Sequence, residues 1–511
     1  MKTITRDALI VASRQELIDT ALSQAALIEK LQSEFQELKF KLEWFKRQIF
    51  GTKSERFIPS DDLQEALDLG IVKDEETSSE VPAKLITYEK KNKETPKPAH
   101  GRGNMPTHLP IKDSVIEPEG DLTGMVRIGE EVSWYYEMDK PASLHVVRLI
   151  RPKYVLPKQD GVLIGELPAL PVEKGNAGPG FIANILIDKF VYHLPLDRQR
   201  KKFKNEYNVD FSESWLCDNS RNGIFWLEPV FNGYVKNILS SDYLQADETP
   251  IPVLTKDKKG KTHRGYFWVY HDPVRKIVIF DYRKSRSREG PNEFLKNFKG
   301  TLQVDGYEGY GEIISRNHLK HSACMDHVRR RFEKALDYDK ERAQHALDII
   351  REWYLLEREA REKELSSEDR LIIRKEKIAP SMFSFKEWLL EQISAVLPKS
   401  PIGIALSYAL NQWPFFEPYL NDGRIEISNI LIENAIRPVA LGRKNFLFAG
   451  SHDAAQRAAI IYSLVSIAKM HGYDPFVYIK ELLTELPKAK SSEISRFLLP
   501  DWKPSKPSGN S

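Results

Sequence analysis

Apolar residues near the N-terminus recur alternately four and three positions apart. The series runs from Leu17 to Ile49 without Gly or Pro, and Gln24 is its one polar member. Such a period places a narrow apolar seam along a helix, which is typical of a coiled coil. We therefore predict an oligomerisation helix over residues 1–51 and a homo-oligomer that is at least a dimer. An amphipathic helix docked on its own domain is the alternative.

The periodicity is lost over residues 52–105, which we interpret as a charged linker. Its basic, breaker-rich part, residues 90–103, could neutralise phosphates or simply be solvated. Short alternating runs at 131–136 and 144–150 then predict strands of a small β module over residues 106–165. This module contains no cysteine and its histidines lack ligand spacing, so no zinc site is predicted.

Residues 166–238 return to helical periodicity. Pro179 is expected to open one helix, and a second helix carries a cluster of basic residues ahead of a turn at 208–210. Ser212 has the chemistry of an N-cap for a third helix. A tight turn beside a cationic face suggests a helix-turn-helix-like DNA-binding segment, although a simple packed hairpin is the alternative. The basic cluster consists of Arg198, Arg200, Lys201, Lys202 and Lys204.

The period changes again over residues 239–334. Strands are expected near 243–254, 265–271, 276–282, 300–307 and 320–325. Helices are expected near 290–298, near Tyr310 and from Asp326. The order β-β-β-α-β-α-β is that of an α/β, ribonuclease-H-like catalytic core. In such a core the first and fourth strands are neighbours.

Two acids lie on those two strands. Asp247 and Asp305 are 58 positions apart in sequence, yet they would lie side by side. Paired carboxylates can hold two Mg²⁺ or Mn²⁺ ions that activate a hydroxyl and stabilise the leaving oxyanion in phosphoryl transfer. Ordinary turn or solvent-facing acids are the alternative reading.

A third carboxylate is expected after a helical, charged stretch at 335–424, which we interpret as an all-helical insertion. In the following segment, 425–450, Asn429, Glu433 and Arg437 share one helical spacing of four. Glu433 is the predicted third ligand, with Glu426 and Asp422 as competitors that precede the helix. Asn429, Arg437, Arg443 and Lys444 are predicted to contact DNA phosphates.

Composition limits the class of protein. The chain has 511 residues, two cysteines and a net charge of +3, so DNA binding must come from local patches. The longest apolar stretch, 458–468 within a C-terminal helical segment (451–511), is too short to span a bilayer. Without a signal-like N-terminus, we expect a cytoplasmic, nucleoid-associated protein of bacterial type with no membrane partner.

Four strings resemble the insertion sequence 66 family of transposases, namely 47–57, 246–250, 305–307 and 437–451. The resemblance implies a DDE enzyme with the triad Asp247, Asp305 and Glu433. It also implies two divalent ions, double-stranded DNA as element ends and target, and accessory proteins encoded by the element. The family's zinc cysteines are absent here, and its paired Asn reads Asn429–Ile430. Cys324 and His327 match a C-x-x-H element, which we interpret as residues that support the core.

The function predicted from these features is metal-dependent DNA cleavage and strand transfer. Two alternatives remain: a ribonuclease-H-like nuclease that does not join strands, and an inactive, DNA-binding remnant of a transposase. Detection of a strand-transfer product separates the first alternative from the prediction.

Overall fold

The computed structural model describes residues 107–139, 143–155, 162–172, 175–254 and 262–504. These residues belong to a compact unit, Met105–Ser511. The predicted coiled coil and charged linker lie outside the described residues. In the described part of the chain, no helix is long and apolar enough to cross a membrane.

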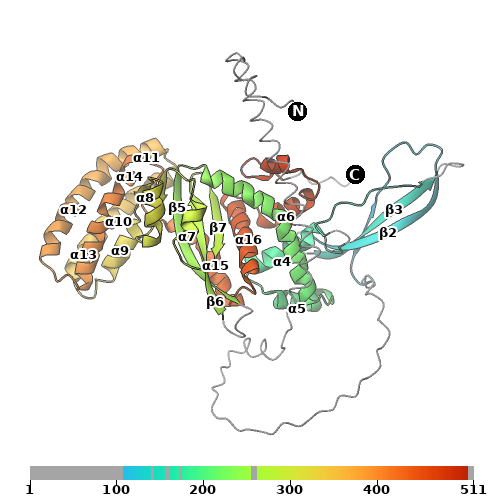
Figure 1. Ribbon diagram of the computed structural model, residues 1–511, viewed down its shortest axis with the longest axis horizontal. Helices are drawn as coiled ribbons and strands as arrows, with labels where there is room; N and C mark the ends of the chain where they lie inside the picture. The colour runs from blue at the N-terminus through green and yellow to red at the C-terminus, as the bar shows by residue number, and fades with distance from the viewer. Residues whose placement is uncertain (1–106, 140–142, 156–161, 173–174, 255–261, 505–511) are drawn as a thin grey trace, which may run out of the picture. The chain divides into compact units, whose positions relative to one another are not determined.

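The first sheet is a small mixed sheet of four strands at the N-terminal side of the unit. Its strands are β1 (Ile111–Val115), β2 (Val126–Asp139), β3 (Ser143–Val155) and β4 (Leu163–Ile164). β3 is central, antiparallel to β2 and β4 and parallel to β1. β2 and β3 form the long projecting ribbon in Figure 1. Its outer half is exposed and its inner half, around Tyr136, is buried against α4.

Three helices follow, and local sequence signals set their ends. α4 (Pro179–Phe190) has Pro at its first position, as predicted. α5 (Leu196–Tyr207) ends at Asn208, whose φ of 50° is the left-handed conformation that asparagine tolerates. α6 (Glu213–Leu239) begins after Ser212, whose side chain accepts a hydrogen bond from the Trp215 amide, so the predicted N-cap is confirmed.

The second sheet has five strands in the order β7-β6-β5-β8-β9. They are β5 (Tyr243–Leu254), β6 (Thr262–Asp272), β7 (Ile277–Arg283), β8 (Thr301–Gln303) and β9 (Lys320–Ser322). β5, β6 and β7 form an antiparallel meander, whereas β5, β8 and β9 run parallel. The expected contact between the first and fourth strands of this region is thus confirmed. β8 is shorter than expected, because the chain turns after Gln303 toward Asp305.

Short helices connect the strands of this sheet. α7 (Glu289–Phe294) lies between β7 and β8, and it ends earlier than the sequence suggested. η1 (Glu308–Tyr310) and α8 (Gly311–Arg316) connect β8 to β9, and α9 (Met325–Glu333) follows β9.

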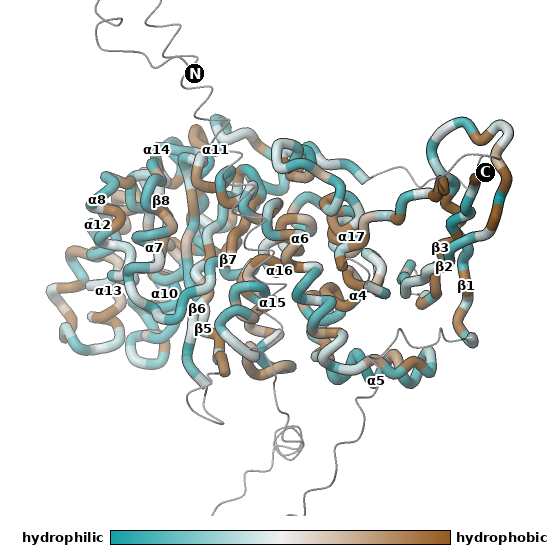
Figure 2. Tube along the Cα trace, turned by 45° about the vertical axis from the view of Figure 1, so that its right-hand side comes forward, coloured by the Kyte–Doolittle hydropathy of each residue, from teal (hydrophilic) through white to brown (hydrophobic). Residues whose placement is uncertain are grey.

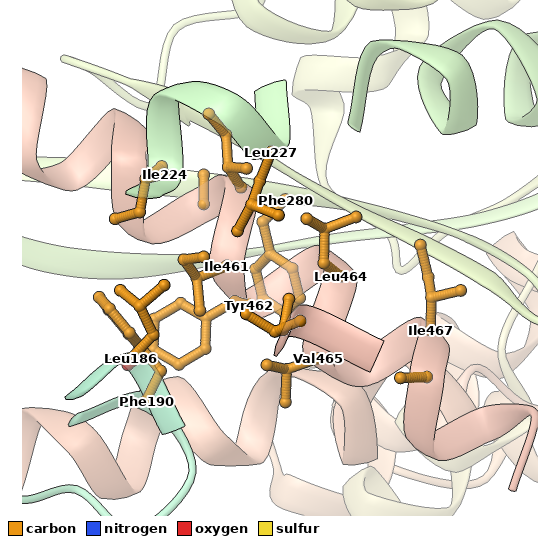
Figure 3. Packing of buried hydrophobic residues seen from close by; sticks show 14 of the residues in the cluster. Leu186, Phe190, Ile224, Leu227, Phe280, Ile461, Tyr462, Leu464, Val465 and Ile467 are labelled. Atoms are coloured by element: carbon orange, nitrogen blue, oxygen red, sulfur yellow. The ribbon is translucent and has the colours of Figure 1, made fainter. Parts of the chain in front are cut away.

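The apolar stretch 458–468 lies within α16 (His452–Met470), which packs on β7 and α6. Figure 3 shows Ile461, Tyr462 and Leu464 of this helix beside Phe280 of β7 and Ile224 of α6. α17 (Pro475–Glu485) packs on α4, and η4 (Ser491–Phe497) packs on α6. In Figure 2 hydrophobic positions gather along α4 and β7, near α16. A helix that is apolar on most sides is therefore a core helix here, not a membrane span.

Between β9 and the later core helix the structure is entirely helical within the described residues. The elements are α10 (Lys340–Glu362), α11 (Ser367–Ile373), η2 (Arg374–Ile378), α12 (Ala379–Ser394), α13 (Pro401–Gln412), η3 (Trp413–Phe416) and α14 (Glu417–Asn421). They share a second apolar cluster with α9, including Phe332, Trp353 and Phe385. The chain then returns to the sheet as α15 (Ile430–Phe446), which contacts β5 and β6 (Figure 1).

Candidate active site

The first two predicted acids lie at matching distances along two adjacent parallel chain segments, Asp247 within β5 and Asp305 two residues beyond the end of β8. Tyr243 is opposite Thr301, and Gln245 is opposite Gln303. Asp247 and Asp305 each come two positions later, on chains that run in the same direction. Neighbouring strands are about 4.8 Å apart, so this register brings the two carboxyl groups to one region of the sheet.

The third predicted acid approaches from α15. Glu433 lies in the first turn of that helix, and its Oε2 is 2.5 Å from Arg330 Nη2 on α9. His327, one turn earlier on α9, has its Nε2 3.9 Å from Asp305 Oδ2. Asp305 and Glu433 therefore each approach a side chain of α9, His327 and Arg330 respectively.

The charges of the other two predicted acids affect the pKa of Asp247. Burial raises the pKa of Asp247 to about 8, and the neighbouring charges of Glu248, Asp305 and Glu433 act in the same direction. The amide of Glu248 donates to Asp247 Oδ1 at 2.7 Å. Crowded, buried carboxylates of this kind are stabilised by cations.

A fourth carboxylate supports the site, and the sequence analysis missed it. Glu248 accepts hydrogen bonds from Arg286 and, at 3.2 Å, from the Tyr310 hydroxyl. Burial raises the pKa of Glu248 while Arg286 lowers it. The Arg286 guanidinium lies 4.0 Å from the centre of the Tyr307 ring. In the sequence, Glu248 could have been noticed only by its position next to Asp247 within residues 246–250.

Cys324, which lies between β9 and α9, is hydrogen-bonded to Asn429 at the start of α15. Its thiol donates to Asn429 Oδ1 at 2.8 Å and accepts from the Asn429 amide at 3.3 Å. Burial raises the pKa of Cys324 to about 12, so the protonated donor persists at neutral pH. Both contacts fit the core-supporting role suggested for Cys324.

The same contacts correct the prediction for Asn429. This residue is 0 % exposed and is the N-cap of α15, not part of the Glu433 face. It therefore lies in the core in this structure and has no surface with which to contact DNA. Its neighbour Ile430, in contrast, is 41 % exposed at the helix start.

Two glutamines, each two positions before a catalytic candidate, hold the segment that leads into α15. Gln245 Nε2 donates to Ser428 O at 3.1 Å, and Gln303 Nε2 donates to Glu426 O at 2.7 Å. The Tyr243 hydroxyl donates to Gln303 Oε1 at 2.7 Å and accepts from the Glu426 amide at 3.0 Å. These buried bonds fix the approach of Glu433 to the strands that carry the two aspartates.

The two competing acids are already occupied by arginines. Glu426 pairs with Arg361 and Arg370 of the helical region, each at 3.1 Å. Asp422 pairs with Arg424 at 2.7 Å. Neither carboxylate faces Asp247 or Asp305 through any contact of the described residues, which leaves Glu433 as the better third candidate.

The donor set fits hard divalent cations. Asp247, Asp305 and Glu433 offer only carboxylate oxygens, and Mg²⁺ prefers such ligands together with several waters. In the described part of the chain, no group of three or more His, Cys, Asp or Glu is placed so that it could hold a metal ion. Glu433 is instead paired with Arg330 of α9 at 2.5 Å.

The side chains of the basic cluster of α5 differ in their exposure and in their acidic partners. Arg198, Lys201 and Lys204 are exposed. Lys201 and Arg200 both approach Asp197, at 2.7 and 3.7 Å. A surface hollow of about 390 Å³ beside them is lined by Arg200, Lys201, Lys204, Asn205 and Asp210.

Lys202 is the exception in this cluster. It pairs at 3.2 Å with Asp188, whose side chain is 6 % exposed. Its charge stabilises a buried carboxylate of α4, so the structure does not place Lys202 among the available phosphate-binding groups.

The cations of α15 also differ from one another. Arg437 and Lys444 are exposed. Arg443 is half-buried and donates to the Pro250 carbonyl of β5, and burial lowers its pKa. Arg443 therefore anchors α15 to β5, whereas Arg437 and Lys444 remain available to a ligand.

Comparison with known proteins agrees with this architecture. The family model described as "Transposase IS66 family" matches residues 174–457, and one described as "Transposase C of IS166 homeodomain" matches residues 37–113. The first match spans both the five-stranded sheet and the helical region.

Three relatives from Sinorhizobium fredii (strain NBRC 101917 / NGR234) carry the names uncharacterized protein y4jD, y4hP and y4qI. The first is 29% identical over 93% of this chain and 96% of its own length. The second is 28% identical over 91% and 88% of the two chains. The third is 30% identical over 81% and 79%. On the strength of these matches, the chain belongs to the IS66 family of transposases.

Proposed function

We propose that this transposase is a DDE enzyme with a ribonuclease-H-like core, which cleaves DNA at element ends and joins it to a target. The observation that carries the proposal is the parallel register of β5 and β8. The paired residues Gln245 and Gln303 each stand two positions before an aspartate, and Glu433 lies in the first turn of α15, which supports this triad. The strand order and directions support a ribonuclease-H-like core.

In this mechanism Asp247, Asp305 and Glu433 hold two Mg²⁺ or Mn²⁺ ions. The bound ions supply activation of the attacking hydroxyl and stabilisation of the leaving oxyanion. A cation held there would favour the charged form of Asp247, whose pKa is raised by burial and by its carboxylate neighbours. The Gln245 and Gln303 amides keep α15 in place, and Arg437 and Lys444 attract the phosphates of the strand.

The experiment for this function is an assay that distinguishes joining from nicking. Purified protein is incubated with Mg²⁺ and a labelled duplex that ends in the element's terminal sequence, together with a circular target. A transposase yields labelled, target-length products. A nuclease yields only shortened strands, and an inactive remnant yields a shifted band without either product.

Two copies of the chain are needed to hold two element ends. We propose that the seam from Leu17 to Ile49 supplies this contact. Replacing Leu31 and Leu38 by Glu is expected to lower the molar mass measured by light scattering to that of one chain. An unchanged molar mass, both in this variant and in a chain that begins at Lys53, would exclude the seam as the oligomer interface.

Neutralising the cations of α5 other than Lys202 is expected to weaken binding to any duplex. The variant replaces Arg198, Arg200, Lys201 and Lys204 by Gln. Since each lost phosphate contact removes about 0.9 from the slope of log K against log salt, the slope should fall by up to about 3.6. The measurement is fluorescence anisotropy over a salt series.

The control for this experiment changes the same number of charges elsewhere. Arg351, Arg358, Lys375 and Lys377 are exposed residues of the helical region, and their replacement by Gln should leave the slope unchanged. Equal losses in both variants would indicate a general charge effect and remove α5 as a specific DNA-binding element.

Removing the charge of Asp247 is expected to stabilise the ion-free protein at alkaline pH. The folded pKa of about 8 lies above the ordinary pKa of an aspartate, about 3.8, so the folded state binds more protons than the unfolded state between these values. Stability from this group is therefore present below about pH 4 and declines as pH rises through 8. Asp247→Asn should raise stability by about 1–3 kcal/mol at pH 8.5.

The measurement is urea denaturation at pH 4.5 and pH 8.5 in chelator. The difference in free energy of unfolding between Asp247→Asn and wild type should be smaller at pH 4.5. At pH 8.5, adding 10 mM Mg²⁺ in place of the chelator should also reduce this difference, because the ion stabilises only the wild type. An equal gain at both pH values would show that packing, not charge, is responsible.

A further inference from the structure

Arg330 forms an ion pair with Glu433, the third carboxylate of the proposed metal site. Its Nη2 is 2.5 Å from Glu433 Oε2, and its next acidic neighbour, Asp326, is 4.0 Å away. Glu433 is the leading cause of the raised pKa of Arg330, so the contact is a charge pair as well as a hydrogen bond. The pair links α9, which follows β9, to α15.

The pair has little of the character of a structural ion pair. The side chains of Arg330 and Glu433 are 41% and 27% exposed, and pairs at such exposure contribute only about 0–1 kcal/mol to stability. In the buried pair of Glu357 and Arg374 the two side chains are 3% and 1% exposed. The position of Arg330 therefore calls for an explanation other than stability.

Its chemistry matches the other ligand that the site must hold. A guanidinium binds a phosphate diester with the same fork of donors that it offers a carboxylate. A divalent ion bound to Glu433 and an arginine on the same oxygen exclude each other sterically and by charge. A DNA phosphate entering beside the ions would offer Arg330 an alternative partner.

We propose that Arg330 is an exchangeable counter-ion that moves from Glu433 to a DNA phosphate. In the free protein it neutralises Glu433 and lowers affinity for divalent ions. When a DNA strand is bound, the Arg330 guanidinium binds a phosphate of that strand, and the Glu433 carboxylate is then free to bind the ions. Ion binding and DNA binding are then coupled, and by linkage each strengthens the other equally. This inference rests on the proposed metal site.

The test measures ion affinity without reference to turnover. Free Mn²⁺ is counted by electron paramagnetic resonance in titrations of the full-length wild type, Arg330→Gln and Arg331→Gln. Arg331 is the matched control: it lies on the same helix and stacks on the Tyr408 ring at 5.0 Å. Arg330→Gln should bind Mn²⁺ about 5–10-fold more tightly than wild type, within the usual range of coupling between sites.

Arg331→Gln should leave the affinity within about twofold, far below typical coupling. An unchanged or weaker affinity in Arg330→Gln overturns the proposal, and so does an equal gain in both variants. Circular dichroism establishes that each variant is folded before titration.

A second titration adds a saturating 40-base-pair duplex at low salt, with the duplex alone as blank. The duplex should tighten Mn²⁺ binding by wild type and have little effect on Arg330→Gln. Equal tightening in both proteins overturns the exchange. Glu433→Gln separates this outcome from failure of the metal site itself: if that variant binds Mn²⁺ as wild type does, Glu433 is not a ligand and the proposed triad fails as well.

Discussion

Replacing any one of Asp247, Asp305 and Glu433 should abolish both cleavage and strand transfer. The expected loss for Asp247→Ala, Asp305→Ala or Glu433→Gln is about 10³-fold or more, equivalent to roughly 4 kcal/mol on the barrier. The loss is large because the three carboxylates hold the ions jointly, so no single one can be replaced by the others. The measurement is single-turnover cleavage of an element-end duplex at fixed Mg²⁺.

The control acid is Glu308, which is exposed and three positions after Asp305. Glu308→Gln should keep the wild-type rate. Double variants add a second check, since residues that act as one unit show losses that are not additive. Asp247→Ala combined with Glu433→Gln should therefore be little slower than either single variant. A robust rate in a single variant removes that residue from the triad.

Features that depend on neighbouring residues were accessible from the sequence. The Pro179 helix start and the Ser212 cap involve side chains and amides within one turn, so residue type and spacing were enough. The pairing of β5 with β8 was also accessible, because the strand order of one known fold makes these strands adjacent. The register that then aligns Asp247 with Asp305 follows from equal spacing along both strands.

Features that depend on distant partners were not accessible. Asn429 was predicted to contact DNA, but it is buried and bonded to a thiol 105 positions away in the sequence. Lys202 looked like its neighbours on α5, yet it alone reaches the buried Asp188 of α4. Gln245 and Gln303 carried no signal, since a glutamine in a strand acquires its role from the carbonyls that fold against it. Periodicity and charge describe a residue's own element and not what packs on it.

The second large effect is expected at the buried ion network of the helical region. Glu357 accepts from Arg374 Nε at 2.6 Å, from Arg370 at 2.9 Å and from the Tyr419 hydroxyl at 2.7 Å. Although burial acts in the opposite direction, these partners lower the pKa of Glu357 to about 2. Arg374 also donates to the Asp422 carbonyl at 2.8 Å, four residues before Glu426. The network thus connects α10 and η2 to the segment that enters α15.

Arg374→Met should destabilise the protein by about 3–5 kcal/mol, because it leaves the Glu357 charge buried with only Arg370 as a cationic partner. The measurement is urea denaturation at pH 7. Lys363→Met, at the residue that follows α10, is the matched control. It breaks an exposed pair with Glu359 that is equally short, 2.6 Å, and should cost less than about 0.5 kcal/mol.

The double variant Glu357→Met with Arg374→Met shows whether the buried charge is the cause. Because it removes both charges, it should recover much of the loss, since apolar replacements of a buried pair are often neutral. If the double variant is as unstable as Arg374→Met, the cost comes from the carbonyls of Tyr419 and Asp422 that Arg374 leaves unpaired. In that case the role of Arg374 is to hold the chain entering α15, and DNA cleavage per folded molecule should fall in both variants.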